Sequence, residues 1–314
     1  MKLLNRRSCA FKQRSDCAKS FNSCYTSTMA NLEVTRAQRL DRKVVELFPM
    51  LSRAFAAKLI AEGKVTVNDA VENKPGYKLR AQDIVVVDYV SADEPGVPDI
   101  ALDVLYEDED CVVINKPIGL LSHSKGAYNP EATVATWLRG RLSGLGGERG
   151  GIVHRLDRAT SGVMICAKNP EALSWLQKQF SQRRVKKTYC AVVAGELSPE
   201  AAIVDMPIER NPKAPATFRV GLQGKSAITK YETIQTGAGY SLVRLQPETG
   251  RTHQLRVHLA HLGHPIVGDT FYAGKEADRL YLHAESLEIT IPEGHERKVF
   301  TVSPPPEFLQ RVTQ

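Results

Sequence analysis

The sequence predicts an α+β protein: a small module of two helices and a hairpin, followed by a larger domain with a mixed, largely antiparallel sheet. Three observations predict this class. Apolar residues recur at helical spacing in two short stretches before residue 64. Later apolar runs have the length of strands, and several are spaced for hairpins rather than for crossovers. A polar, proline-bearing stretch at 91–101 separates the two parts as a linker.

Composition places the chain among soluble globular proteins. Of its 314 residues, 42% are hydrophobic, and no apolar run reaches the ~18 residues of a membrane-spanning helix, so we expect no membrane partner. The formal charge of +7 and the pI of about 9.0 suit a polyanionic partner. Residues 1–32 hold six basic side chains against one acid, so the rest carries only about +2. A prediction of nucleic-acid binding therefore depends on local patches.

The first 35 residues are predicted to be a basic, disordered tail outside the fold. Residues 1–28 are serine-rich, nearly free of acid and lack an apolar core segment, which excludes a secretory signal. Two explanations stay open: an organellar transit peptide, or an upstream extension with Met29 as the true start. The second predicts a cytoplasmic protein, and the first an organellar one.

Residues 36–90 form the predicted small module. Leu40 and Val44 recur at helical spacing until Pro49, and a second helix follows Ser52, its expected N-cap. The expected strands cover 65–67 and 84–87, with a turn at Asn68-Asp69 after the first.

The module also carries a basic face. Seven Lys and Arg side chains lie between residues 36 and 64 against three acids, a pattern that a solvated helix face would also produce. The module closely resembles the S4 RNA-binding domain over Arg39-Leu40-Asp41, Ser52-Arg53, Ile60 and residues 63–68. The resemblance implies RNA binding, and Arg39, Arg53 and Lys64 are the expected contacts.

Residues 102–314 form the predicted larger domain. Its expected strands cover 104–107, 111–115, 162–167, 189–194, 227–234, 240–245 and 287–291, and its expected helices 133–142 and 171–180. The acidic run at 108–110 between the first two strands predicts a hairpin turn.

The segment 150–162, Gly-Gly-Ile-Val-His-Arg-Leu-Asp-Arg-Ala-Thr-Ser-Gly, is dense in functional side chains. It places Asp157 on a loop between an apolar entry and the next strand, where catalytic groups are often held. For an isolated aspartate, capping of a turn would be the better explanation, with Arg155 and Arg158 as surface charges.

The whole segment, however, matches the HRLDxxTSG motif of the RluA-type pseudouridine synthases, which the chain resembles over about residues 36–305. Further segments match that family's other motifs in the right order: 114–120, 187–195, 247–259, 263–269 and 280–284. The resemblance implies that Asp157 is the catalytic carboxylate, that Tyr189 is the active-site tyrosine and that Leu282 is an apolar pocket residue. The synthases of large-subunit ribosomal RNA are the most similar members.

The implied reaction explains these residue types. A carboxylate can attack C1′ or C6 of uridine, and a nearby cation, for which Arg251 is the candidate, would keep it ionised. Tyr189 offers an aromatic face and a hydroxyl for proton transfer. The target base must leave its stack, and Arg155 would fill the vacated space or contact phosphate, with His154 as a further RNA contact. No cofactor is expected.

Four other patterns bear on metal or phosphate binding. The histidines at 253, 258, 261 and 264 lack interleaved acids, and the six cysteines form no Cys-x-x-Cys pair, so no metal is expected. The glycine-rich run at 144–151 lacks the Gly-Lys-Ser/Thr ending of a phosphate loop. The acid-free run at 178–187 is a predicted phosphate-binding strip.

We therefore expect a monomeric RNA pseudouridine synthase acting on structured RNA. The S4 module favours ribosomal RNA over transfer RNA. Two rival interpretations remain: a hydrolase of the glycosidic bond, which would need a second carboxylate, and an RNA-binding protein without catalysis. Recovery of an isomer, of free base or of unchanged uridine would separate the three.

Overall fold

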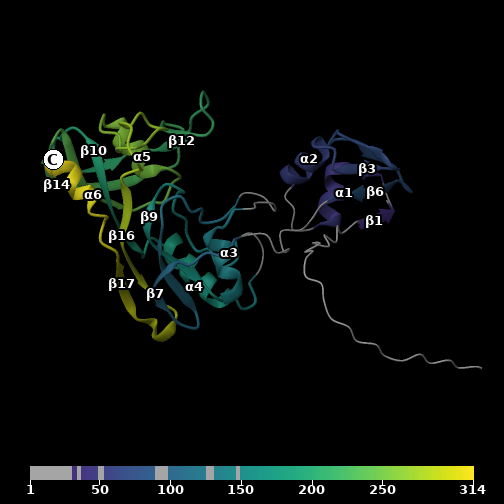
Figure 1. Ribbon diagram of the computed structural model, residues 1–314, viewed down its shortest axis with the longest axis horizontal. Coiled ribbons are helices and arrows are strands. Elements are labelled where there is room, and N and C mark those ends of the chain that lie inside the picture. The colour runs from purple at the N-terminus through teal and green to yellow at the C-terminus, as the bar shows by residue number, and fades with distance from the viewer. Residues whose placement is uncertain (1–29, 34–36, 49–52, 89–97, 125–130, 146–148) are drawn as a thin grey trace, which may run out of the picture.

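The computed structural model describes residues 30–33, 37–48, 53–88, 98–124, 131–145 and 149–314. Figure 1 shows a small body built before residue 89 and a large one built after residue 97. Each body has its own cluster of buried apolar side chains, as the predicted two-part α+β organisation requires. Within the described ranges no helix is long and apolar enough to cross a membrane.

The small body packs two helices against a short antiparallel sheet. Leu40 and Val44 from the first helix and Ile60 from the second are fully buried beside Val65 and Val85 of the sheet. The strand order is β1-β6-β3-β4, with a separate ribbon of β2 and β5. The elements are β1 (Ala30–Glu33), β2 (Gln38–Arg39), α1 (Leu40–Leu47), α2 (Arg53–Ala61), β3 (Val65–Val67), β4 (Ala70–Val71), β5 (Lys78–Leu79) and β6 (Ile84–Val87).

Most of this module agrees with the sequence-based expectation. Both helices form, β3 and β6 have the predicted bounds, and Asn68 and Asp69 make the turn with left-handed φ angles of 49° and 65°. Pro49 and Ser52 lie outside the described residues. One correction concerns the tail, because Ala30–Glu33 pairs with β6 as a strand instead of lying outside the fold.

The large body is built on a nine-stranded sheet of order β11-β14-β15-β10-β16-β9-β8-β7, with β17 beside β16. Only the pairing of β9 with β16 is parallel among these described strands, which confirms the mixed, largely antiparallel prediction. The strands are β7 (Asp103–Glu107), β8 (Cys111–Lys116), β9 (Ser161–Ala167), β10 (Lys186–Ala194), β11 (Ala201–Asp205), β14 (Ile228–Gly237), β15 (Tyr240–Pro247), β16 (Leu282–Thr290) and β17 (Arg297–Thr301). A ribbon of β12 (Ile208–Arg210) and β13 (Phe218–Val220) lies apart from this sheet.

Two helices cover opposite faces of β8 and β9. Because side chains alternate along a strand, Val113 and Ile165 face α4 (Pro170–Ser181), whereas Ile114 and Met164 face α3 (Val134–Leu138). Both faces of these strands are therefore buried, and Figure 1 shows the two helices beside this part of the sheet.

Three helices differ from the expectation. The predicted helix 133–142 ends at Leu138 and continues only as a 3₁₀ turn, Arg139–Arg141, which contains Gly140, a poor helix former. The sequence did not predict α5 (Gln254–His261) or α6 (Glu307–Thr313). α5 starts from a left-handed His253 with φ of 57°, a conformation that periodicity does not reveal.

Candidate active site

Asp157 lies in the loop that leads into β9. Its backbone carbonyl accepts a hydrogen bond of 3.0 Å from the N–H of Thr160, which tightens the turn before the strand. Gly162 follows with φ of 113°, and a Cβ there would collide with the carbonyl oxygen of Ala284 on β16. Glycine is therefore required where this loop enters the parallel pair of β9 and β16.

Two buried polar side chains fix the same loop from the other side. The hydroxyl of Ser122 donates to the carbonyl of Leu156 (2.8 Å) and accepts from its N–H (3.1 Å). The ammonium of Lys116 donates to the carbonyls of Pro117 and Leu120, both at 2.9 Å. Lys116 has no exposed surface, and burial lowers its pKa to about 8. Its Nζ also lies 3.5 Å from the carbonyl oxygen of Arg158, so Ser122 and Lys116 contact the backbone on either side of Asp157.

Arg256, on α5, binds two carboxylates. Its Nε and Nη2 each donate to Asp269 at 2.7 Å, and its Nη1 lies 3.3 Å from Oδ2 of Asp157. Burial alone would lower the pKa of Arg256, but the hydrogen bonds and charges of Asp269 and Asp157 raise it above its usual value. Asp269 therefore fixes the guanidinium, and the guanidinium places a permanent positive charge beside Asp157.

His253 is the second partner of Asp157. Its Nε2 lies 3.7 Å from Oδ2 of the carboxylate, and its Nδ1 lies 2.8 Å from the hydroxyl of Tyr272. Burial lowers the pKa of His253 although the charge of Asp157 acts to raise it. The neutral imidazole is thereby favoured, and its ring is held at the N-terminus of α5.

The pairing expected for Arg251 is corrected by this geometry. Arg251 lines the same cavity, but its Nε donates to the carbonyl of Ser226 at 3.0 Å. Gln254 fixes the turn around it, since its Oε1 accepts from the N–H of Arg251 (3.0 Å) and from the hydroxyl of Thr249 (2.7 Å). Asp157 thus has Arg256 rather than Arg251 as its arginine partner.

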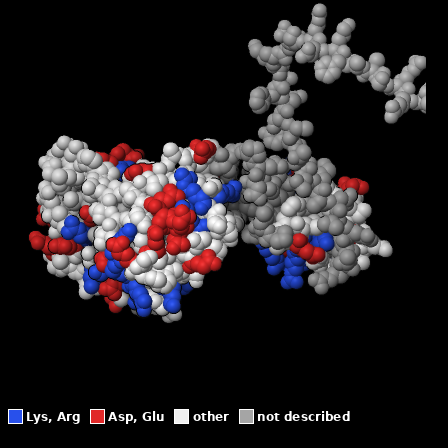
Figure 2. Space-filling view, turned by 90° about the horizontal axis from the view of Figure 1, so that it is seen from below, with Lys and Arg blue, Asp and Glu red and all other residues white. Residues whose placement is uncertain are grey.

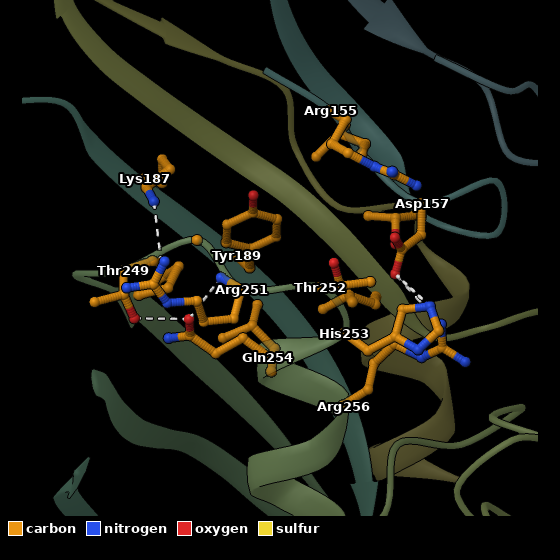
Figure 3. A pocket seen from close by; sticks show the side chains of 16 residues that line it. Arg155, Asp157, Lys187, Tyr189, Thr249, Arg251, Thr252, His253, Gln254 and Arg256 are labelled. Carbon is orange, nitrogen blue, oxygen red and sulfur yellow. Dashed lines mark hydrogen bonds and ion pairs between the residues drawn. The ribbon is translucent and has the colours of Figure 1, made fainter. Parts of the chain in front are cut away.

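A cavity of about 120 Å³ lies next to this group. Figure 3 shows Tyr189 between its two ends, with Asp157 and Arg256 at one end and Lys187 at the other. Tyr189 stands on β10 where the register with β16 shifts, a bulge that changes the direction of side chains. Burial and the charge of Asp157 raise the pKa of Tyr189, so its hydroxyl keeps its proton. Leu282 contributes an apolar wall, as expected.

Basic side chains outnumber carboxylates around this cavity. Lys187 and three arginines line it, and Asp157 is the one carboxylate among the described residues that do. Figure 2 shows basic and acidic side chains interspersed over the visible face of the large body. Recognition of a polyanion therefore falls to local sites such as this one.

His154 does not reach this cavity, which corrects its expected RNA contact. Its Nε2 accepts from the N–H of Ile165 at 3.2 Å, and its ring stacks on Phe180 with centroids 4.7 Å apart. Burial lowers the pKa of His154 to about 3. His154 is therefore a packed, neutral side chain behind the loop, whereas its neighbour Arg155 is exposed at the cavity.

The three basic residues singled out in the small body are all paired. Arg39 and Arg53 bind the buried carboxylate of Asp41 at 3.0 and 2.9 Å, and Lys64 binds Asp88 at 3.0 Å. Their side chains are nevertheless about half exposed, so the charges remain open to solvent on one side.

Sequence reasoning undervalued Lys187, His253, Gln254 and Arg256. All four lie within motif segments, but sequence alone did not show which of them face Asp157. The sequence feature that could have identified two of them is the spacing of His253 and Arg256. They lie three residues apart at the start of a helix and so share one face. Within the described ranges, no cluster of three or more His, Cys, Asp or Glu side chains is placed to hold a metal ion.

Comparison with known proteins gives consistent matches. Residues 110–261 match the model of the family described as RNA pseudouridylate synthase, and residues 38–85 match the S4 domain. An uncharacterized RNA pseudouridine synthase of Aquifex aeolicus is 39% identical over 76% of this chain and 78% of its own length. Ribosomal large subunit pseudouridine synthase D of Yersinia pestis is 40% identical over 81% and 84%. The structure of human RNA pseudouridylate synthase domain containing 1 superposes with a TM-score of 0.56 at 33% identity, covering 68% and 86%.

Proposed function

The chain belongs to the RNA pseudouridylate synthase family, and we propose that it isomerises uridine in large-subunit ribosomal RNA with Asp157 as nucleophile. The observation that supports this most is the position of Asp157. It is the one carboxylate among the described residues of the cavity, and Arg256 and His253 face it. A glycosidase would use a second carboxylate, which these lining residues do not supply.

The reaction rearranges bonds without adding or removing atoms. Asp157 attacks C1′ and displaces N1, or it adds to C6 of the ring, after which the bond between C1′ and N1 breaks. The detached uracil turns in the cavity, and C5 bonds to C1′ as the carboxylate is released. The proton on C5 then leaves, and N1 takes up a proton. Tyr189 keeps its hydroxyl protonated and offers both a ring face for uracil and a group for proton transfer.

Access to the cavity requires the uridine to leave its helix. Unstacking a base costs a few kcal/mol, which contacts outside the helix must offset. Arg155 is exposed at the cavity and is not held by Asp157. We assign it the space that the flipped base vacates, or a neighbouring phosphate.

Ribosomal RNA is favoured as substrate by two findings. Several relatives are named ribosomal large subunit pseudouridine synthase D. The S4 domain match supplies a second RNA-binding unit. Pseudouridines should be mapped in RNA from cells that lack the chain, then from cells complemented with wild type or with Asp157→Asn. Loss of sites in large-subunit RNA, restored only by wild type, is expected; loss confined to transfer RNA would overturn the substrate assignment.

Lys187 gives a prediction about pH. Burial lowers the pKa of its ammonium to about 8, so the charge is present below that pH and lost above it. If the ammonium holds uracil or phosphate in the cavity, activity should fall as pH rises through about 8. Lys187→Met should reduce activity about ten-fold at pH 7, the scale of one hydrogen bond to a charged group, and should remove that decline.

The control is Lys230→Met, because Lys230 is exposed and pairs with Glu248 outside the cavity. It should keep both the rate and the pH profile. A decline near pH 8 that persists in Lys187→Met would instead be assigned to Lys116, whose pKa is also about 8 and which donates to the carbonyl of Arg158, the residue after Asp157.

The small body gives a second prediction. Deletion of residues 36–88 should weaken binding to ribosomal RNA while sparing the rate at saturating substrate. Lys and Arg contacts to phosphate release counterions, and each lost contact reduces the salt slope by about 0.7–0.9. Binding should be titrated at several salt concentrations, and an unchanged slope would show that the body does not touch RNA.

A further inference from the structure

A second hollow of about 530 Å³ lies on the other side of Asp157. Four residues line both it and the smaller cavity: Arg155, Asp157, His253 and Arg256. Asp157 therefore stands at the junction of two connected spaces. If the smaller one holds the target base, the strand that carries it has to pass this junction.

Phe271 is the unusual residue of the second hollow. Its side chain is 55% exposed, more than that of any other Phe, Tyr or Trp in the described parts of the chain. Exposure of an aromatic ring forgoes the stabilisation that burial would give. An aromatic residue at such a position is explained if a ligand covers it.

The backbone around Phe271 is firmly held. The N–H of Phe271 donates to Oδ1 of Asp269 at 3.2 Å, and the same carboxylate binds Arg256. Gly268 begins this turn with φ of 79°, and a Cβ there would collide with the carbonyl of Arg279. The carboxylate that fixes Arg256 beside Asp157 therefore also fixes the exposed ring.

Two side chains already pack against the ring. The guanidinium carbon of Arg256 lies 5.4 Å from the ring centroid, and the His253 ring lies 6.2 Å away at an interplanar angle of 24°. Phe271 nevertheless stays 55% exposed at the hollow, so part of the ring is open to contact with a further flat group. Nucleobases are such groups, and every base has a face that can stack on an aromatic ring.

The charges around the hollow suit a nucleotide. Arg155, Arg158 and Arg256 line it against Asp157 and Asp269. Asp269 binds Arg256 and the N–H of Phe271, and Arg158 is half exposed and contacts Glu131. The cationic side chains thus outnumber the carboxylates, as expected where phosphates pass.

We propose that this hollow binds the nucleotide next to the target uridine in the same RNA strand, with its base stacked on Phe271. The inference rests on the proposed function, because it needs a uridine in the smaller cavity. Phe271 is a substrate-binding residue in this assignment, and it makes activity depend on the presence of a neighbouring base. A purine, which has the larger face, should be preferred over a pyrimidine.

The test uses a synthetic RNA stem-loop that contains a uridine modified by the wild-type chain. The kcat/KM is measured for wild type and for Phe271→Ala on the normal RNA and on RNAs with an abasic residue 5′ or 3′ of the target. Phe271→Ala should lose about ten-fold in kcat/KM, mainly through KM, as expected for one stacked base. On one of the two abasic RNAs, the kcat/KM of wild type should fall to the value of Phe271→Ala on the normal RNA. The kcat/KM of Phe271→Ala should not fall further on that abasic RNA.

Two more variants separate stacking from bulk. Phe271→Leu keeps an apolar side chain without an aromatic face and should behave like Phe271→Ala, whereas Phe271→Trp should retain the wild-type rate. Leu309→Ala, on α6 and 50% exposed, is the control for removing an exposed apolar side chain and should change nothing. A 2-aminopurine at the same neighbouring position should lose fluorescence on binding to wild type but not to Phe271→Leu.

Several results would overturn the inference. The first is a wild-type kcat/KM for Phe271→Ala on the normal RNA. The second is a Phe271→Ala variant whose kcat/KM is lower than that of wild type by the same factor on the normal RNA and on both abasic RNAs. The second result would mean that Phe271 only shields Arg256 and Asp269. If wild type forms no pseudouridine in any RNA, the proposed function itself fails. If wild type is active but neither Phe271→Ala nor the abasic RNAs lower kcat/KM, only the stacking site is contradicted.

Discussion

Replacement of Asp157 by asparagine is expected to abolish pseudouridine formation while RNA binding stays within a few-fold of wild type. An amide has nearly the volume of a carboxylate but is a very poor nucleophile, so the fold should survive and the first step should not occur. Loss of a catalytic nucleophile costs roughly 10⁴-fold or more in rate. The Arg256 guanidinium and the His253 ring would then face a neutral side chain, without loss of packing.

The measurement follows from the reaction. The hydrogen on C5 is released when C5 becomes the attachment point, so RNA labelled with tritium at C5 reports turnover directly. Asp99→Asn is the control, because Asp99 is an exposed carboxylate away from both cavities. Retention of a tenth or more of the wild-type rate in Asp157→Asn would contradict the nucleophile assignment.

RNA that carries 5-fluorouridine at the target position gives a stricter version of this test. Fluorine cannot leave C5 as a proton does, so the pathway should stall or end in an altered nucleoside. We expect a long-lived complex or a fluorinated product that depends on Asp157 and forms without any added cofactor. Release of free 5-fluorouracil would indicate a hydrolase, and unchanged nucleoside with intact binding an inactive RNA-binding protein.

Arg256→Met is expected to have the second largest effect, on both stability and activity. The side chain of Asp269 has no exposed surface, and methionine would leave its charge buried without a partner. Removing one member of a buried ion pair costs about 3–5 kcal/mol of unfolding free energy. Asp157 would also lose its fixed cation, so activity should fall severely even in the folded fraction.

A double variant separates these two losses. Arg256→Met combined with Asp269→Asn removes the orphaned charge, so denaturant unfolding should show most of the stability restored. Activity should stay low, because Asp157 still lacks its partner. Arg251→Met provides the matched comparison, since Arg251 donates to the carbonyl of Ser226 and should cost little stability. A greater loss of activity in Arg251→Met than in Arg256→Met would favour Arg251 as the cation that serves Asp157.

The sequence by itself determined the family, the two-part α+β class and the position of the central carboxylate. These follow from local features: periodic apolar residues for α1 and α2, alternation for β3, a continuous apolar run for β6, and an uninterrupted motif around Asp157. The local sequence is sufficient for these predictions because each feature lies within one continuous segment. The same reasoning placed Tyr189 and Leu282, which the structure brings to one cavity.

Only the tertiary structure decided which arginine faces Asp157. Arg251 and Arg256 lie five residues apart in one motif, and nothing in their order distinguishes them. The left-handed His253 starts α5 between them, which directs Arg256 towards Asp157 and Asp269 while Arg251 turns to Ser226. The direction of a side chain depends on the backbone conformation and on partners distant in sequence, and neither is encoded in a local pattern.

The same reason accounts for His154 and Phe271. His154 lies within the central motif and packs on Phe180 behind the loop, whereas Phe271 lies two residues beyond the segment 263–269 and stands exposed at the second hollow. The parallel pairing of β9 with β16 places Gly162 against Ala284, more than a hundred residues away in the chain, and so closes the site. Contacts of such separation form only once the whole sheet is assembled, because long-range pairing is set by the fold and not by the segment.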